Sequence, residues 1–157
     1  MTDLSDLYNA RILELAAAIP PARRLAEPDG SAQAHSKLCG STIIVDIKLN
    51  GGKVAEFGQS VKACLLGQAS ASVMARNIIG SDEAELRRVA GEMRRMLKEN
   101  GAAPDGRWAD LAVLEPVRAV KARHTSTLLV FEAVERALDA AAAKAPPSAP
   151  ASAPASA

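Results

Sequence analysis

The sequence predicts an α+β fold in which a small antiparallel sheet packs against several helices. Apolar residues recur every three to four positions near the N-terminus and again in the second half of the chain, which is typical of amphipathic helices. Between these regions, residues 42–49 alternate in polarity, as expected for a strand with one buried face. The turn sequence Asn50-Gly51-Gly52 follows this segment directly, and such turns favour a β-hairpin.

The first helix is expected over residues 3–19, and Pro20-Pro21 would end it because proline interrupts a helix. The apolar stripe of this predicted helix consists of Leu4, Tyr8, Ile12, Leu15 and Ile19. The repeat follows one face of a helix with 3.6 residues per turn, so this face is expected to pack against the rest of the domain.

The two strands of the hairpin are predicted over residues 42–49 and 53–61. One face of the first strand carries Ile43, Val45, Ile47 and Leu49. The opposite face carries Thr42, Ile44, Asp46 and Lys48. Residues 33–37 could add a short strand before Cys39. The middle of the chain is therefore expected to form a small antiparallel sheet.

Helical patterns occupy the rest of the chain. A segment rich in small residues is expected to be helical from about Gly67 and to end at Gly80. Ser81 would cap the next helix, which Asn100-Gly101 would stop. The segment from Trp108 to Leu114 is predicted as a short element, and a final helix is predicted over residues 125–143.

The composition indicates one globular domain over residues 1–143, in a chain of 157 residues. Residues 144–157 contain only Lys, Ala, Pro and Ser, and are predicted to form a disordered tail. The net charge of +1 argues against binding to nucleic acid or a membrane surface. The N-terminal residues include acids and lack a basic signal-peptide start, so a cytoplasmic location is expected.

The two cysteines, Cys39 and Cys64, stand at the start of one hairpin strand and beyond the end of the other. A hairpin brings these positions together, so the thiols are expected to be neighbours. Cys64 also precedes a predicted helix and follows Lys62, which favours the thiolate that binds metal or attacks sulfur. The alternative is that each cysteine only fills space in the core. His35 and His124 are the other soft ligands available, although a lone histidine is more often a surface or hydrogen-bonded residue than a ligand.

Three segments resemble the family of iron–sulfur cluster assembly scaffolds formed by IscU, SufU and the N-terminal domain of NifU. They are "LYNARILELAAAIPPARRL", "CGSTIIVDIKLNGGKVAEFGQSVKACLLGQASASVM" and "RHTSTLLVFEAVERAL". The stretch "ACLLGQASASVMA" is especially similar to the SufU type, and the resemblance covers about residues 4–140. It implies an IscU/SufU-like fold.

Residue by residue, Cys39 and Cys64 match the first two cysteines of the family. Ser41 stands where the family has the Asp of Cys-Gly-Asp, and Ser126 stands where it has the third Cys. A serine hydroxyl is a poor ligand beside thiolate, histidine or carboxylate, which argues against tight zinc binding of the SufU type. His124, two residues before Ser126, or His35, four residues before Cys39, could supply part of the missing ligand set. The segment "AVKAR", 119–123, replaces the chaperone-binding Leu-Pro-Pro-Val-Lys element.

The resemblance implies a scaffold that binds iron and a labile iron–sulfur cluster, expected to be [2Fe–2S], through Cys39, Cys64 and His124. It also implies a cysteine desulfurase and recipient apoproteins as partners. Two chains giving two thiolates each would bridge one cluster in a homodimer. One alternative is a sulfur-transfer protein that accepts persulfide without holding a cluster, and another is a non-catalytic adaptor of the same fold. The protein is expected to be a scaffold or carrier rather than an enzyme. If it is an enzyme, the expected activity is that of a sulfurtransferase.

Overall fold

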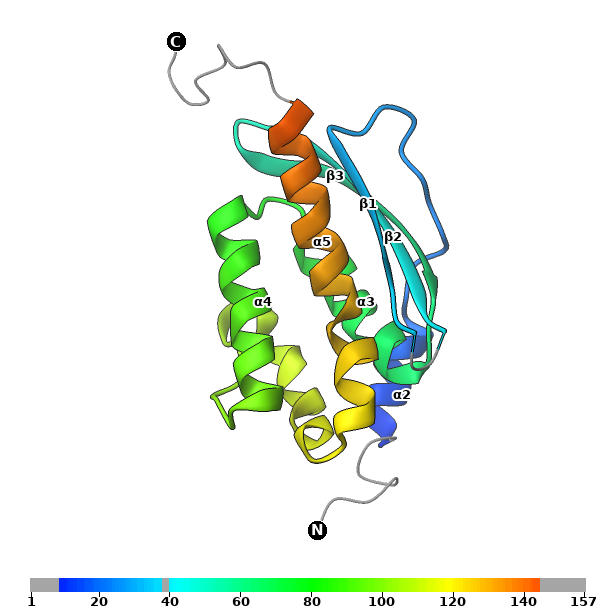
Figure 1. Ribbon diagram of the computed structural model, residues 1–157, viewed down its shortest axis with the longest axis vertical. Coiled ribbons are helices and arrows are strands. Elements are labelled where there is room, and N and C mark those ends of the chain that lie inside the picture. The colour runs from blue at the N-terminus through cyan, green and yellow to red at the C-terminus, as the bar shows by residue number, and fades with distance from the viewer. Residues whose placement is uncertain (1–8, 38–39, 145–157) are drawn as a thin grey trace.

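The computed structural model describes residues 9–37 and 40–144 and has a layer of helices on one face of a three-stranded sheet (Figure 1). The elements in chain order are α2 (Ala10–Ala17), β1 (Gly30–His35), β2 (Thr42–Asn50), β3 (Lys53–Lys62), α3 (Leu65–Asn77), α4 (Glu83–Lys98), the 3₁₀-helices η1 (Gly106–Ala119) and η2 (Lys121–Arg123), and α5 (His124–Lys144). Helix α5 packs along β1 and β2, and α4 lies beside α5 (Figure 1). No helix in the described part of the chain is long and apolar enough to cross a membrane.

The sheet is antiparallel with strand order β1-β2-β3, which confirms the predicted α+β fold and the hairpin. Gly51 and Gly52 have φ of 63° and 81°, and a tight two-residue hairpin turn of this kind requires positive φ at both central positions. Strand β1 begins three residues before the short strand expected at 33–37 and ends at His35. It pairs with β2 so that His35 lies opposite Thr42.

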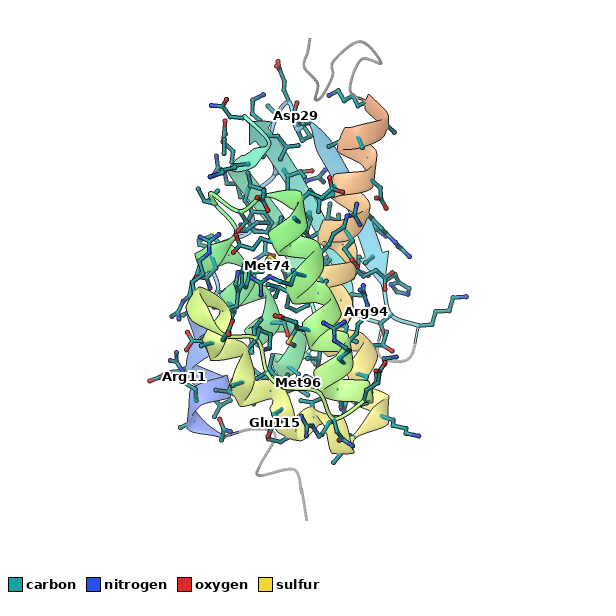
Figure 2. The ribbon with its side chains drawn as sticks, turned by 90° about the vertical axis from the view of Figure 1, so that its left-hand side faces the viewer. Arg11, Asp29, Met74, Arg94, Met96 and Glu115 are labelled. Atoms are coloured by element: carbon teal, nitrogen blue, oxygen red, sulfur yellow. The ribbon has the colours of Figure 1, made fainter. Side chains whose placement is uncertain are left out.

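The core lies between the sheet and the helices. Ile43, Val45 and Ile47 have no exposed surface, as their alternation predicts. Met74 of α3 and Met96 of α4 contribute to the same core (Figure 2). These side chains share the interior with one long face of α5.

Asp46 was predicted on the polar face of its strand, and it does lie there, but it is fully buried. The segment between α2 and β1 covers this face, and its Arg24 Nε and Leu25 N donate to Asp46 Oδ2 at 2.6 and 3.0 Å. Ser31 Oγ donates to Asp46 Oδ1 at 2.6 Å. Burial alone would raise the pKa of Asp46, but the hydrogen bonds from Arg24, Ser31 and Leu25 outweigh it and the pKa is lowered.

Helix boundaries differ from the predictions in two places. Asp82, not Ser81, caps α4, because the Asp82 carboxylate accepts from Glu85 N at 2.8 Å. Ser81 is buried instead, and its hydroxyl donates to Asn77 O at 3.1 Å. Helix α3 begins at Leu65, two residues before the predicted Gly67, so that it starts directly after Cys64.

The segment predicted as a short element around Trp108–Leu114 is a 3₁₀-helix that extends from Gly106 to Ala119. Its buried residues are Trp108, Leu111, Leu114 and Val117. With three residues per turn, side chains three positions apart share one face of such a helix. The strict spacing of three was therefore the sequence signal for this element.

Helices α2 and α5 are the first and last helices of the described residues. Helix α2 ends at Ala17, ahead of Pro20-Pro21, and residues 3–8 of the predicted first helix lie outside the described residues. Helix α5 includes Lys144, the first residue of the predicted tail, whose ammonium group donates to Pro28 O at 2.9 Å. The rest of the predicted tail, 145–157, also lies outside the described residues.

Candidate functional site

Cys64 occupies the N-cap position of α3, between the end of β3 and the first helical residue. Its backbone is extended, with φ of −68° and ψ of 172°, and its side chain forms no capping hydrogen bond with the helix. The thiol is partly exposed. The first turn of α3 presents unpaired N–H groups next to this position.

The Cys64 side chain meets Ser126, which lies in the first turn of α5. Cys64 Sγ donates to Ser126 Oγ at 3.5 Å, and Ser126 Oγ donates to Arg123 O at 3.2 Å. Thr127 Oγ1 donates to the same carbonyl at 2.8 Å. When Cys64 is a thiolate, the Ser126 hydroxyl can therefore turn to donate to the sulfur while Thr127 still satisfies the Arg123 carbonyl. Ser126 can therefore act either as the acceptor or as the donor toward Cys64 Sγ.

Close packing of α3 against α5 holds this pair together. A Cβ atom at Gly67 would lie 2.8 Å from Ala63 Cβ and 3.1 Å from Ser126 O. A side chain at this position would therefore clash with Ala63 and would press α3 away from the start of α5 by a few tenths of an ångström. Ser126 is 1% exposed, so the hydroxyl beside Cys64 belongs to a buried side chain that solvent does not reach.

The loop that contains Cys39 reaches the same end of the sheet. Thr42 is paired with His35 on one side and with Lys62 on the other, which brings the loop ends next to the segment that leads to Cys64. Ser36 N donates to Ser41 O at 2.8 Å, and Ser41 is buried. Cys39 itself lies outside the described residues, so its expected proximity to Cys64 stays a prediction.

His124 is the first residue of α5 and is buried. Its Nε2 lies 3.0 Å from Val117 O and 3.2 Å from Arg118 O. Carbonyl oxygens only accept hydrogen bonds, so Nε2 carries the hydrogen and only Nδ1 remains for a metal. His35 instead lies on the exposed side of the sheet end, where its Nδ1 is 2.8 Å from Thr42 Oγ1.

Within residues 9–37 and 40–144, no three His, Cys, Asp or Glu side chains are grouped closely enough to hold a metal ion. The described part of the site therefore supplies one thiol with a hydroxyl beside it. A complete ligand set would need Cys39, a second chain or a ligand from a partner.

Comparison with solved structures places the fold among known proteins. The N-terminal part of a nitrogen-fixing NifU-like protein from Brucella abortus is 55% identical, with a TM-score of 0.88, over 90% of this chain and 99% of that one. A protein assigned as the iron–sulfur cluster assembly scaffold of the SUF system in Fervidobacterium islandicum is 18% identical, with a TM-score of 0.78, over 87% and 99% of the two chains.

A hypothetical protein is 20% identical, with a TM-score of 0.68, and is matched over 87% of this chain and 99% of its own. The two matches at 18% and 20% identity show a shared fold. No protein-family model and no curated protein matches this chain.

Proposed function

This chain belongs to the family of NifU-like N-terminal domains, with IscU and SufU as its relatives, and on that premise we propose that it is a scaffold for iron–sulfur cluster assembly. The observation that carries the proposal is the match to the Brucella abortus domain at 55% identity over 90% of the chain. The geometry around Cys64 agrees with it, since a partly exposed thiol stands at a helix start beside a hydroxyl.

In this proposal Cys64 and Cys39 are the cluster ligands, and Nδ1 of His124 is a third candidate. The cluster is cargo, assembled on the protein and passed to a recipient apoprotein. Ser126 stands beside Cys64 Sγ at 3.5 Å, at the position where the family has a third cysteine. With two thiolates per chain, a [2Fe–2S] cluster would be bridged between two chains, because such clusters need about four ligands.

A second candidate function is transfer of sulfur without a bound cluster. It is favoured by the lack of a three-ligand group among the described residues, because sulfur transfer needs one accessible thiolate and no metal site. The Cys64 thiolate would attack the outer sulfur of a persulfide on a cysteine desulfurase. A new S–S bond forms on Cys64, the S–S bond of the desulfurase breaks, and its cysteine leaves as a thiolate.

Anaerobic reconstitution with iron and sulfide tests the scaffold function. Iron and sulfide are counted per chain, visible absorbance reports the cluster, and gel filtration reports the oligomer. We expect one [2Fe–2S] cluster per two chains and a dimer. One cluster per monomer would instead favour His124 as a ligand, and His124→Ala would then lose it.

Ser126→Cys is expected to retain iron against a chelator roughly 10–100-fold better than the wild type, because it restores a thiolate beside Cys64. Ser72→Cys is the matched control, because Ser72 is a buried serine of α3 whose hydroxyl has no hydrogen-bond partner among the described residues. If neither the wild type nor Ser126→Cys holds a cluster, the scaffold function is excluded. Transfer of labelled sulfur from a desulfurase to Cys64 then tests the second candidate.

A further inference from the structure

A cavity of about 500 Å³ is lined by residues from the end of α4 and the start of α5. These two helix ends lie side by side at the lower end of the view in Figure 1. The polar residues that line it are Lys98, Asn100, Arg118, Lys121, His124 and Thr125. Cavities of roughly 300–1,000 Å³ are the usual size for small-molecule sites. His124 is also the third candidate cluster ligand, but neither the cluster site nor the ion pairs of the described residues account for Lys98 and Lys121.

The lining carries three permanent positive charges, on Lys98, Arg118 and Lys121, and includes no carboxylate. In the described part of the chain, neither lysine takes part in an ion pair. Most arginines of the protein are paired, as Arg136 is with Glu132 at 2.6 Å. Arg118 is paired with Glu115 at 3.4 Å, so the uncompensated charges at this corner are those of Lys98 and Lys121.

Arg118 is held in place before any ligand arrives. Its Nη2 donates to Gly101 O at 3.0 Å, and an oxygen of Glu115 lies 3.4 Å from Nη2. Its Nε is buried and has no hydrogen-bond partner among the described residues. A guanidinium that is already positioned loses little side-chain entropy when an anion binds.

The ends of α4 and α5 also contribute to the electrostatic potential at the cavity. Helix α5, with 21 residues, begins at the cavity and presents the positive end of its dipole there, whereas α4 ends there with the negative end. Each helix end is equivalent to about half a charge, so the two largely cancel. The unpaired charges on Lys98 and Lys121, together with the guanidinium that Arg118 shares with Glu115, therefore make the site positive.

We propose that this cavity binds a small oligo-anion that carries two or more phosphate or carboxylate groups. Arginine and lysine are the side chains that recognise both groups, through charge-assisted hydrogen bonds. Several anionic groups are needed to match three cations spread around one cavity. Thr125 lines the cavity and is followed by Ser126, so a bound anion would contact the same helical turn that supports Cys64.

The proposal does not depend on the cluster function, and metal-free, reduced protein tests it. The full chain is titrated by calorimetry with inorganic pyrophosphate and, separately, with citrate, at low ionic strength. We expect one site per chain and weaker binding as salt is added. The amide NMR signals of Asn100 and Thr125 are expected to shift with the same affinity, which locates the site.

Lys98→Gln/Lys121→Gln is expected to weaken binding by about tenfold or more, because it removes two charge-assisted contacts. Lys48→Gln/Lys53→Gln is the matched control, with the same loss of charge at the hairpin end of the sheet, and should change affinity by less than about twofold. Thermal unfolding of both double variants verifies that they fold.

Each ligand result has a defined meaning. Binding of pyrophosphate alone assigns the site to phosphates, binding of citrate alone assigns it to carboxylates, and binding of both supports the shared chemistry. The proposal is overturned if neither anion produces heat or NMR shifts. It is also overturned if the two double variants lose affinity equally, because binding would then reflect net charge and not this cavity.

Discussion

Asp46 in β2 and Cys64 just after β3 both carry ionisable side chains, but they differ in burial and in the number of hydrogen bonds that hold them. Asp46 is fully buried and receives hydrogen bonds of 2.6 to 3.3 Å from Arg24, Leu25 and Ser31. Cys64 is partly exposed, and its described side-chain contact is one hydrogen bond of 3.5 Å to Ser126. The first group is fixed by several partners, whereas the second is placed by its backbone and left free to change partners.

The difference follows from what each group does. Asp46 fastens the segment before β1 to the outer face of the sheet, and Arg23 N adds a bond of 3.0 Å to Gln59 O. This segment runs so close to β3 that a Cβ atom at Gly58 would lie 2.7 Å from Arg23 O. Cys64, in contrast, can exchange its proton for metal or sulfur without breaking a network. The Asp46 carboxylate is therefore held rigidly, whereas the Cys64 thiol can bind a new partner without loss of other hydrogen bonds.

The substitution Cys64→Ala is expected to have the largest effect and tests the contrast between Cys64 and Asp46 most directly. We expect it to abolish cluster reconstitution and persulfide transfer, since it removes the one described thiol. The free energy of unfolding should change by less than about 1 kcal/mol, because a partly exposed thiol with one weak hydrogen bond contributes little. Visible absorbance after reconstitution and urea denaturation measure the two effects. Retention of a full cluster would contradict the assignment of Cys64.

Asp46→Ala should have the opposite signature, with cluster binding kept in the folded fraction and stability reduced by about 2–4 kcal/mol. The substitution removes a fully buried carboxylate and leaves the part-buried donors of Leu25 and Ser31 without their acceptor. Arg24→Ala is the matched control and should cost clearly less than Asp46→Ala, because the Arg24 side chain is 54% exposed and its ion pair is screened by solvent. Equal costs in urea denaturation would show that the ion pair, and not the buried acceptor, carries the stability.

The pH dependence of stability should isolate the contribution of Asp46. The pKa of folded Asp46 lies below its ordinary value of 3.8, so its contribution is present above that value and is lost as pH falls through the lower, folded pKa. The pKa of Glu85 is also lowered: burial would raise it, but hydrogen bonds from Trp108 and Arg107 outweigh that effect, so wild type alone does not isolate Asp46. Asp46→Asn should lose less stability than wild type between about pH 5 and pH 2. Parallel curves would contradict the role given to Asp46.

The smallest effect is expected from removal of residues 145–157, which contain only Ala, Pro and Ser. Such a segment has few side chains to bury, so the melting temperature should change by no more than about 1 °C. Lys144 is kept because its ammonium group donates to Pro28 O. A fall of several degrees in calorimetry would show that the tail packs against the domain.

Part of the candidate site could be predicted from the sequence. The hairpin pattern placed Cys64 at the sheet end, and the family resemblance matched Ser126 to a third cysteine; the structure brings these two side chains into contact. The bond from His124 Nε2 to two carbonyls was not predictable, because those carbonyls belong to a 3₁₀-helix whose type had not been assigned. The hydrogen-bond partners of a side chain depend on where the neighbouring helices and strands end in space.

The sequence by itself determined the local structure: the alternation of Ile43, Val45 and Ile47 sets the buried face, and Gly51-Gly52 sets the turn. These features depend on backbone dihedrals and on a period of two, which are properties of neighbouring residues. Only the tertiary structure decided that Asp46 is buried and that Lys98, Arg118 and Lys121 surround one cavity. Residues far apart along the chain meet there because helices and loops pack to cover apolar surface, and no local pattern encodes which polar groups that packing brings together.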